Sequence, residues 1–342
     1  MSQTAAPQNV PETAPVSPQK PQFQLGGQAL IEGVMMRGPS HVAAAVRRAD
    51  GTIQTRVEPF ASILKKRPYL NIFLLRGIFA LFEMLALGMN YLNWSSNLAL
   101  EDENLRKQNA GENAQNAPKK LPLWLFLLTI CASLALGAGL FVVLPNLVAH
   151  FAFEPLIGND TRPKVVALTW IEGAVKVAIF VAYVYLIGRR KNIRRVFEFH
   201  GAEHKVVYAV ENARPLTPEG ARPFDTPHPR CGTGFALLTV FVSVVCYSFL
   251  PWPEEHLPRV GMRLLLMPLV AGISYEILKA TVNPRFSALA VLIMTPGLWL
   301  QRLTTEQPDD AQLEVACEAM RVLLEQEQAQ GARSKEQAQP TL

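Results

Sequence analysis

Two histidines four residues apart, with a glutamate beside the second, are the residues of this chain best suited to chemistry. They are His200, Glu203 and His204. In a helix, side chains at positions i and i+4 lie on one face, so both imidazoles can reach a single metal ion. Glu203 lies close enough to act as a general base on a water bound to that ion. The spacing is the inverted counterpart of the zincin motif.

A purely structural interpretation of the two histidines is also open. They extend an apolar face, and packed core histidines would give the same pattern; that face contains Ile193, Val196, Phe197 and Val207. Gly201, between the histidines, disfavours a helix. The chain has only six histidines in 342 residues, however, so a pair at ligand spacing favours metal binding.

A second cluster, His228 and Cys231, follows on the same loop. This spacing lets both side chains bind one ion across a turn, although a loop that merely starts a helix would look the same. Together, His200, His204, His228 and Cys231 predict one nitrogen- and sulfur-rich site for a divalent metal. Such a donor set suits zinc, our first choice, or iron.

The number of ligands decides what such a site can do. Three protein ligands leave a coordination position for water and permit catalysis with Glu203 as the base. Four ligands close the site and make it structural. Glu276 is a further possible ligand, because its predicted helix ends on the same side of the membrane. The sequence leaves both arrangements open.

Long apolar runs between residues 121 and 300 indicate an integral membrane protein. Hydrophobic residues form 49% of the chain, but they are concentrated in these runs. Four of the runs predict spanning helices, at residues 121–148, 165–187, 235–250 and 262–281. A fifth, at 286–300, is too short to cross comfortably and predicts a re-entrant or interfacial helix.

Glu172 and Lys176 lie inside the second predicted span, four residues apart and opposite in charge. Charges within a membrane are costly, so this pair is expected to face the helix bundle and not the lipid. The pair would be either a mutually neutralised structural element or a functional one, and the sequence does not choose.

These patterns predict a mainly α, polytopic helical membrane protein with about four spanning helices, interfacial helices and a small N-terminal antiparallel β unit. Asp50-Gly51 between two β-like runs is the hairpin signal within that unit. The predicted segments are a disordered tail (1–25), the β unit (26–68), an interfacial or packed helix (69–100), a flexible linker (101–120), the membrane domain (121–300), an amphipathic helix (301–328) and a second disordered tail (329–342).

The distribution of arginine and lysine predicts the orientation. The loop at residues 189–231 is strongly basic, whereas the short connections near 150–163 and 251–259 each hold a single arginine. The positive-inside rule therefore places the long loop in the cytoplasm. With four spans, both termini and the β unit lie on that side as well. A multi-pass protein of the bacterial inner membrane is expected.

Several motifs resemble signatures of the YqhQ-like family of bacterial polytopic membrane proteins. The resemblance runs from about Gly26 to Arg321, and its motifs are Gly26–Pro39, Phe199–Lys205, His228–Thr233, Ala271–Ile277 and Pro296–Gln301. It implies a membrane protein with a domain of unknown function that has been labelled a predicted metal-dependent enzyme. It supplies no substrate.

Two functions are compatible with these observations. The first is a metal-dependent hydrolase at the cytoplasmic face of the membrane, acting on a lipid or a membrane-linked peptide. The second is a non-enzymatic scaffold or transporter-like bundle whose metal site clamps the long loop. Glu203 distinguishes them, because it would either serve a metal-bound water or hydrogen-bond a ligand histidine. The lipid bilayer is the expected partner, and the net charge of +5 without stacking platforms argues against nucleic acid.

Overall fold

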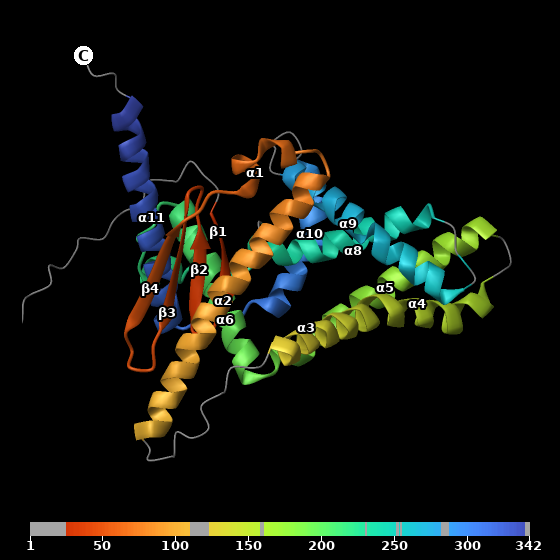
Figure 1. Ribbon diagram of the computed structural model, residues 1–342, viewed down its shortest axis with the longest axis horizontal. Helices are drawn as coiled ribbons and strands as arrows, with labels where there is room; N and C mark the ends of the chain where they lie inside the picture. Colours follow the sequence, from red (N-terminus) through yellow and green to blue (C-terminus); the bar gives the residue numbers. More distant parts are fainter. Residues whose placement is uncertain are drawn as a thin grey trace, which may run out of the picture.

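A computed structural model describes most of the chain as helix, with one small sheet (Figure 1). The described residues are 25–109, 123–157, 161–229, 231–250, 253, 255–281 and 287–338. The predicted tail at 1–25 lies almost wholly outside them, as do residues 110–120 of the predicted linker.

The N-terminal β unit is a four-stranded antiparallel sheet in the order β1-β2-β3-β4. Its strands are β1 (Gly26–Leu30), β2 (Gly33–Arg37), β3 (His41–Arg47) and β4 (Ile53–Pro59). The predicted hairpin at Asp50-Gly51 joins β3 to β4, and Gly51 has a φ of 89°, which suits glycine. The mainly α fold class with a small β unit is therefore confirmed.

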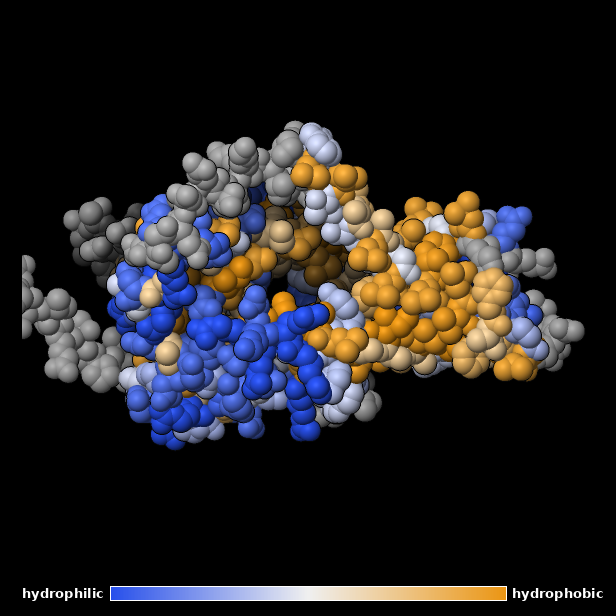
Figure 2. All heavy atoms as spheres, turned by 90° about the horizontal axis from the view of Figure 1, so that it is seen from below, coloured by the Kyte–Doolittle hydropathy of each residue, from blue (hydrophilic) through white to orange (hydrophobic). Residues whose placement is uncertain are grey.

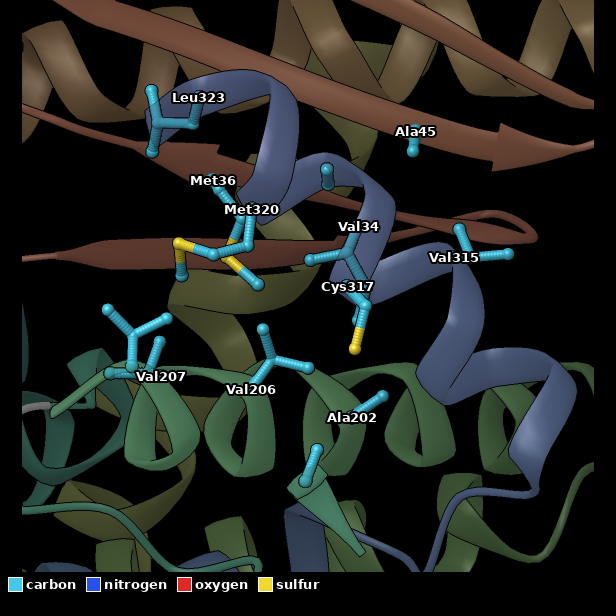
Figure 3. Close-up of a cluster of buried hydrophobic side chains, with 14 of the residues drawn as sticks. Val34, Met36, Ala45, Ala202, Val206, Val207, Val315, Cys317, Met320 and Leu323 are labelled. Atoms are coloured by element: carbon cyan, nitrogen blue, oxygen red, sulfur yellow. The ribbon is translucent and has the colours of Figure 1, made fainter. Parts of the chain in front are cut away.

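Both faces of this sheet are buried, which explains how so small a unit is stable. On one face, Val34 and Met36 of β2 pack against α6 (Lys191–Glu211) and α11 (Asp310–Ala338) (Figure 3). On the other face, Met35 contacts Tyr91 of α2 (Leu75–Asn109). Two short helical segments, α1 (Ile63–Lys66) and η1 (Pro68–Leu70), connect the sheet to α2.

The apolar runs form a bundle of antiparallel helices beside this sheet unit (Figure 1). The bundle contains α3 (Leu123–Ala138), η3 (Gly139–Val143), α4 (Leu144–Val148), η4 (Ala149–Phe153), η5 (Glu154–Leu156), α5 (Thr161–Gly188), α8 (Gly232–Ser248), α9 (His256–Thr281) and α10 (Ser287–Thr304). The segments η3 and η4 are single π-helical turns, so α3 to η4 runs as one continuous helix.

Four helices among the described residues are long and apolar enough to cross a membrane. They cover Leu75–Gln108, Cys131–Leu156, Arg162–Gly188 and Leu257–Ala280. Helix α8, which the sequence predicted as a span, is a shorter apolar helix, whereas α2 joins the candidates. The second half of α2 nevertheless packs on the sheet through Tyr91 and Leu98, in keeping with the prediction of a packed helix.

Helix α2 continues to Asn109, beyond the predicted boundary at residue 100. The polar residues that suggested a linker make long-range contacts there. The Asp102 carboxylate accepts hydrogen bonds from the Arg48 side chain at 2.8 Å and from the Ala49 amide at 2.7 Å. These bonds fix the end of the helix to the β3–β4 hairpin, which a local sequence pattern cannot show.

The C-terminal amphipathic helix is also longer than predicted. Helix α11 runs from Asp310 to Ala338, and its apolar stripe is buried against the sheet as expected. That stripe contains Leu313, Cys317, Met320 and Leu324. Helix α10 likewise extends to Thr304, four residues past the predicted end of the short apolar segment.

A polar lobe and an apolar lobe result from this arrangement (Figure 2). The sheet, α6 and α11 form the polar lobe, and α3 to α5, α8 and α9 extend from it as the apolar lobe (Figure 1). Two helical hairpins, one that ends in α5 and one formed by α8 and α9, turn at the far end of the apolar lobe (Figure 1). The β unit, α6 and α11 therefore lie at the same end of the bundle (Figure 1).

A buried ion cluster occupies the middle of the apolar lobe. Lys176 lies 2.9 Å from Glu172, and Arg263 of α9 pairs with the other carboxylate oxygen. All three side chains are at most 12% exposed, and Asn146 of α4 also contacts Glu172. The predicted pair thus faces the bundle, where it joins α4, α5 and α9.

Replacing Glu172 with glutamine tests how much this cluster stabilises the bundle. The variant leaves the positive charges of Lys176 and Arg263 buried without their carboxylate. We expect the free energy of unfolding in detergent to fall by about 3–5 kcal/mol, measured by chemical denaturation. Glu318→Gln is the control, because the partly exposed Glu318–Arg321 pair should contribute less than about 1 kcal/mol. Equal losses in both variants would contradict the assignment.

Candidate metal centre

Helix α6 carries the two histidines, as the spacing predicted. Gly201, which disfavours a helix, is needed for a different reason. A Cβ atom at this position would overlap the backbone carbonyl of Glu306, in the connection between α10 and α11. The glycine therefore lets that connection lie directly on α6, next to His200.

The structure brings three of the predicted ligands together. The candidate ligand atoms of His200, His204 and Cys231 all lie within 4.8 Å of one another. His200 Nε2 is 3.2 Å from Cys231 Sγ, and the two imidazole rings have centroids 4.5 Å apart. Cys231 belongs to the N-terminus of α8, so the group joins α6 to the start of an apolar helix.

Backbone carbonyls fix the tautomers of both histidines. His200 Nδ1 lies 2.8 Å from the carbonyl oxygen of Thr304, and His204 Nδ1 contacts that of Thr226. A carbonyl oxygen only accepts hydrogen bonds, so Nδ1 carries the proton in each neutral ring. Both Nε2 atoms are then left with a lone pair for the site, which is how ligand histidines are usually oriented in metalloproteins.

The spacing of these atoms suits a tetrahedral ion. Zn–N and Zn–S bonds of about 2.0–2.1 Å and 2.3 Å place neighbouring ligand atoms about 3.3–3.6 Å apart. The separations within the group, from 3.2 Å to at most 4.8 Å, bracket these values. Two imidazole nitrogens and one thiol sulfur form a donor set that zinc or ferrous iron accepts.

Electrostatics around the group also favours metal ligation. Burial lowers the pKa of His204, so its imidazole stays neutral and able to bind a metal. Cys231 occupies the N-cap of α8, so its sulfur lies at the start of that helix. The Thr233 hydroxyl lies 3.3 Å from the same sulfur and can donate a hydrogen bond to it.

His228 stands beside this group and not within it. Its ring packs against His204 and Tyr208, with centroid distances of 5.5 and 4.5 Å, and its Nε2 atom is 3.6 Å from a carboxylate oxygen of Glu211. Gln301 of α10 holds the His228 backbone through two hydrogen bonds, of 2.7 and 2.9 Å. Among the described residues, the group that lies together therefore has three candidate ligands, not four.

Glu203 faces the sheet from the same turn of α6. Its carboxylate lies against β1, where the Gly27 backbone N–H interacts with it and where a Cβ on Gly27 would be 2.8 Å from Oε1. Burial raises the pKa of this carboxyl, while the charges of His200 and His228 act in the opposite direction. Neither His200 nor His204 uses Glu203 as a hydrogen-bond partner.

Glu276, the further possible ligand, is engaged elsewhere. Its carboxylate receives a hydrogen bond of 2.6 Å from Arg76 Nε, which ties α9 to the start of α2.

Sequence reasoning missed the residues that orient the candidate site, namely Thr226, Thr304, Gln301 and Tyr208. Thr226 and Thr304 act through their backbone carbonyls, which every residue has, so the sequence gives no sign of their role. Gln301 does lie in a motif used for the family resemblance, but nothing in that motif indicates its role.

Comparison with known proteins places the chain in a family. Residues 72–326 match the family described as "Protein of unknown function (DUF1385)". The chain belongs to this family. It is also 36% identical over 309 residues to the "Uncharacterized protein YqhQ" of Bacillus subtilis (strain 168), covering 87% of this chain and 92% of that protein. No solved structure matches.

The comparisons confirm the resemblance to YqhQ-like proteins and add no activity. Neither the description of the family nor the name of the relative mentions a metal or an enzyme. The metal-dependent activity that the resemblance implied therefore stays a prediction, and it depends on the geometry of the site.

The ligand set can be tested by metal analysis of the purified protein. If His200, His204 and Cys231 bind one ion, the wild type should contain about one zinc per chain. His204→Ala removes a ligand and should lower the zinc content to a small fraction of that value. His228→Gln is the matched control on the neighbouring ring and should retain the metal. Loss of zinc in both variants would instead make His228 the fourth ligand, and full zinc in both would remove the site.

Proposed function

We propose that the protein is a metal-dependent hydrolase at the cytoplasmic face of the bacterial inner membrane, acting on a lipid or a membrane-linked peptide. The observation that carries the proposal is the set of three converging ligand atoms, with both histidines held by backbone carbonyls. Three protein ligands are the number found in catalytic zinc sites, because they leave one position for water or substrate.

Different residues of the chain would hold the ion and transfer the proton. His200, His204 and Cys231 would hold the ion, which, when bound, supplies a Lewis acid and lowers the pKa of water to about 7. Hydrolysis consumes one water, whose proton must leave and whose oxygen must reach the scissile bond. A second group that accepts this proton and returns it to the leaving atom is therefore needed.

Glu203 is the residue we assign to this proton transfer. Its pKa is raised by burial, which brings a carboxyl nearer to the pH at which it can both accept and donate a proton. The carbonyls of Thr226 and Thr304 already orient the ligand histidines. Orientation of these rings therefore does not require Glu203, whose carboxylate interacts electrostatically with His200 and His228.

Glu203→Gln tests the assignment, because glutamine keeps the size of the side chain but cannot accept a proton at neutral pH. We expect normal zinc content, normal thermal stability and a failure to complement the phenotype of a deletion strain. Loss of a general base typically lowers the rate by a factor of about 100 to 10,000. Glu198→Gln is the control and should complement, because Glu198 lies about 140° round the same helix from Glu203 and its carboxylate accepts a hydrogen bond from Gln312. Normal complementation by Glu203→Gln would reject the enzyme.

A structural metal site is the second candidate function. The three ligands join α6 to the N-terminus of α8, so a bound ion would also clamp the 189–231 loop where it returns to the bundle. In a scaffold or transporter-like protein, loss of the metal would lower stability and function together, and Glu203→Gln would be silent or would destabilise the fold.

The orientation in the membrane is part of the proposal. Arginines and lysines gather on the side of the sheet, α6 and α11, and the positive-inside rule places that side in the cytoplasm. A reporter fused after Arg195 should therefore give a cytoplasmic signal, and one fused after Leu250 should give the opposite signal. Signals from the same side at both positions would reject four crossings with this orientation.

A further inference from the structure

A cavity of about 790 Å³ opens next to the candidate metal centre. Its size lies in the range of small-molecule sites, about 300–1,000 Å³. Much of its wall is aromatic or aliphatic, from Tyr208 of α6, Phe224 of the long loop, and Leu298 and Trp299 of α10. Three segments far apart in the sequence thus combine to make one mostly apolar surface.

Only one histidine ring separates this cavity from the ligand group. Tyr208 lines the cavity and lies 4.5 Å from the His228 ring, which in turn lies 5.5 Å from the His204 ring. The Tyr208 hydroxyl donates a hydrogen bond of 2.9 Å to the Pro227 carbonyl, which keeps the wall in place. The cavity is therefore a neighbour of the candidate metal centre, with the Tyr208 and His228 rings between them.

Two opposite charges stand on the polar side of the cavity. Arg302, in the last turn of α10, and Asp225, in the long loop, line both this cavity and a neighbouring one of about 330 Å³. Within the described part of the chain, neither side chain has a hydrogen bond or an ion pair, with each other or with another residue. Neither charge is therefore engaged by a direct hydrogen-bonded partner, although the Lys205 ammonium acts on Asp225 electrostatically.

The cavity is lined by residues of α6 and the long loop, on the side of the polar lobe, and by residues of α10, in the helix bundle. Trp299 is 56% exposed on α10, and tryptophan is enriched at membrane–water interfaces. Arg302 follows Trp299 toward the polar lobe, so the apolar part of a ligand and its charged part would each meet a matching surface.

We propose that this cavity binds a phospholipid with a zwitterionic, amine-bearing headgroup. The guanidinium of Arg302 would pair with the phosphate, the carboxylate of Asp225 with the ammonium group, and Leu298, Trp299 and Phe224 with the first part of the acyl chains. As the assignment of a substrate class, this inference rests on the proposed hydrolase. As a binding site, it stands on the cavity and its charges alone.

Charge complementarity decides between this ligand and the alternatives. An anionic lipid would use Arg302 but would meet the unpaired Asp225 carboxylate as a repulsive group. A free phosphorylated amine would match both charges but would leave the apolar wall in water. Only a ligand with phosphate, amine and acyl chains satisfies all three features.

Binding can be measured on the detergent-purified, full-length protein by isothermal titration calorimetry. The probes are dihexanoyl phosphatidylethanolamine, dihexanoyl phosphatidylglycerol and phosphoethanolamine. We expect saturable binding of the first and at least tenfold weaker binding of the other two. Arg302→Gln should weaken phosphatidylethanolamine binding roughly 10- to 100-fold, the range for loss of a hydrogen bond to a charged group. Arg214→Gln, at an exposed arginine outside the cavity, should leave it unchanged.

Asp225→Asn provides the sharper comparison. It should weaken binding of phosphatidylethanolamine while leaving phosphatidylglycerol binding unchanged or stronger. Equal binding of the two lipids with no effect of Asp225→Asn would overturn the proposal in favour of an anionic-lipid site. Equal binding of phosphoethanolamine, or no saturable binding of any probe, would also overturn it.

Zinc content measured in the same samples separates this inference from the proposed function. Normal zinc without lipid binding would overturn the lipid site and leave the hydrolase untouched. Lipid binding in a protein that holds no zinc would overturn the hydrolase and leave the lipid site in place.

Discussion

The close approach of residues 304–306 to helix α6 is the contact on which the rest of the site depends. At Gly201 the two backbones are so near that any side chain would overlap the Glu306 carbonyl. The same approach gives His200 its hydrogen bond to Thr304 and lets the Glu306 amide bond to the Phe197 carbonyl at 3.0 Å. Because residues 304–306 connect α10 to α11, this contact sets the start of α11 on the polar lobe and the end of α10 at the cavity.

Helix α6 consequently contacts different neighbours on its two faces. Ala202 and Val206 pack against the sheet and α11 (Figure 3), while His200 and His204 face the start of α8. Burial of the first face fixes the rotation of the helix about its own axis. This rotation in turn determines where His200 and His204 point. A site built on a rigid helix holds its geometry better than one built on loops.

Sequence reasoning reached the parts of this arrangement that depend on local spacing. The i, i+4 pattern places His200 and His204 on one face, and apolar periodicity identifies the stripe of α11. It could not reach the parts that depend on distant partners. The end of α2 is held by Arg48, Gly201 is required by Glu306, and His228 is positioned by Gln301, which is 73 residues away. Each is a contact between segments whose proximity only the tertiary fold creates.

The position of His228 bears most directly on whether the site is open. To become a fourth ligand, its ring would have to leave the packing between His204 and Tyr208, while Gln301 holds its backbone through both the amide and the carbonyl. Burial lowers the pKa of His228, while the charge of Glu203 acts in the opposite direction. The packing of the ring and the two hydrogen bonds to the backbone, and not the charge of the ring, separate His228 from the candidate ligand group.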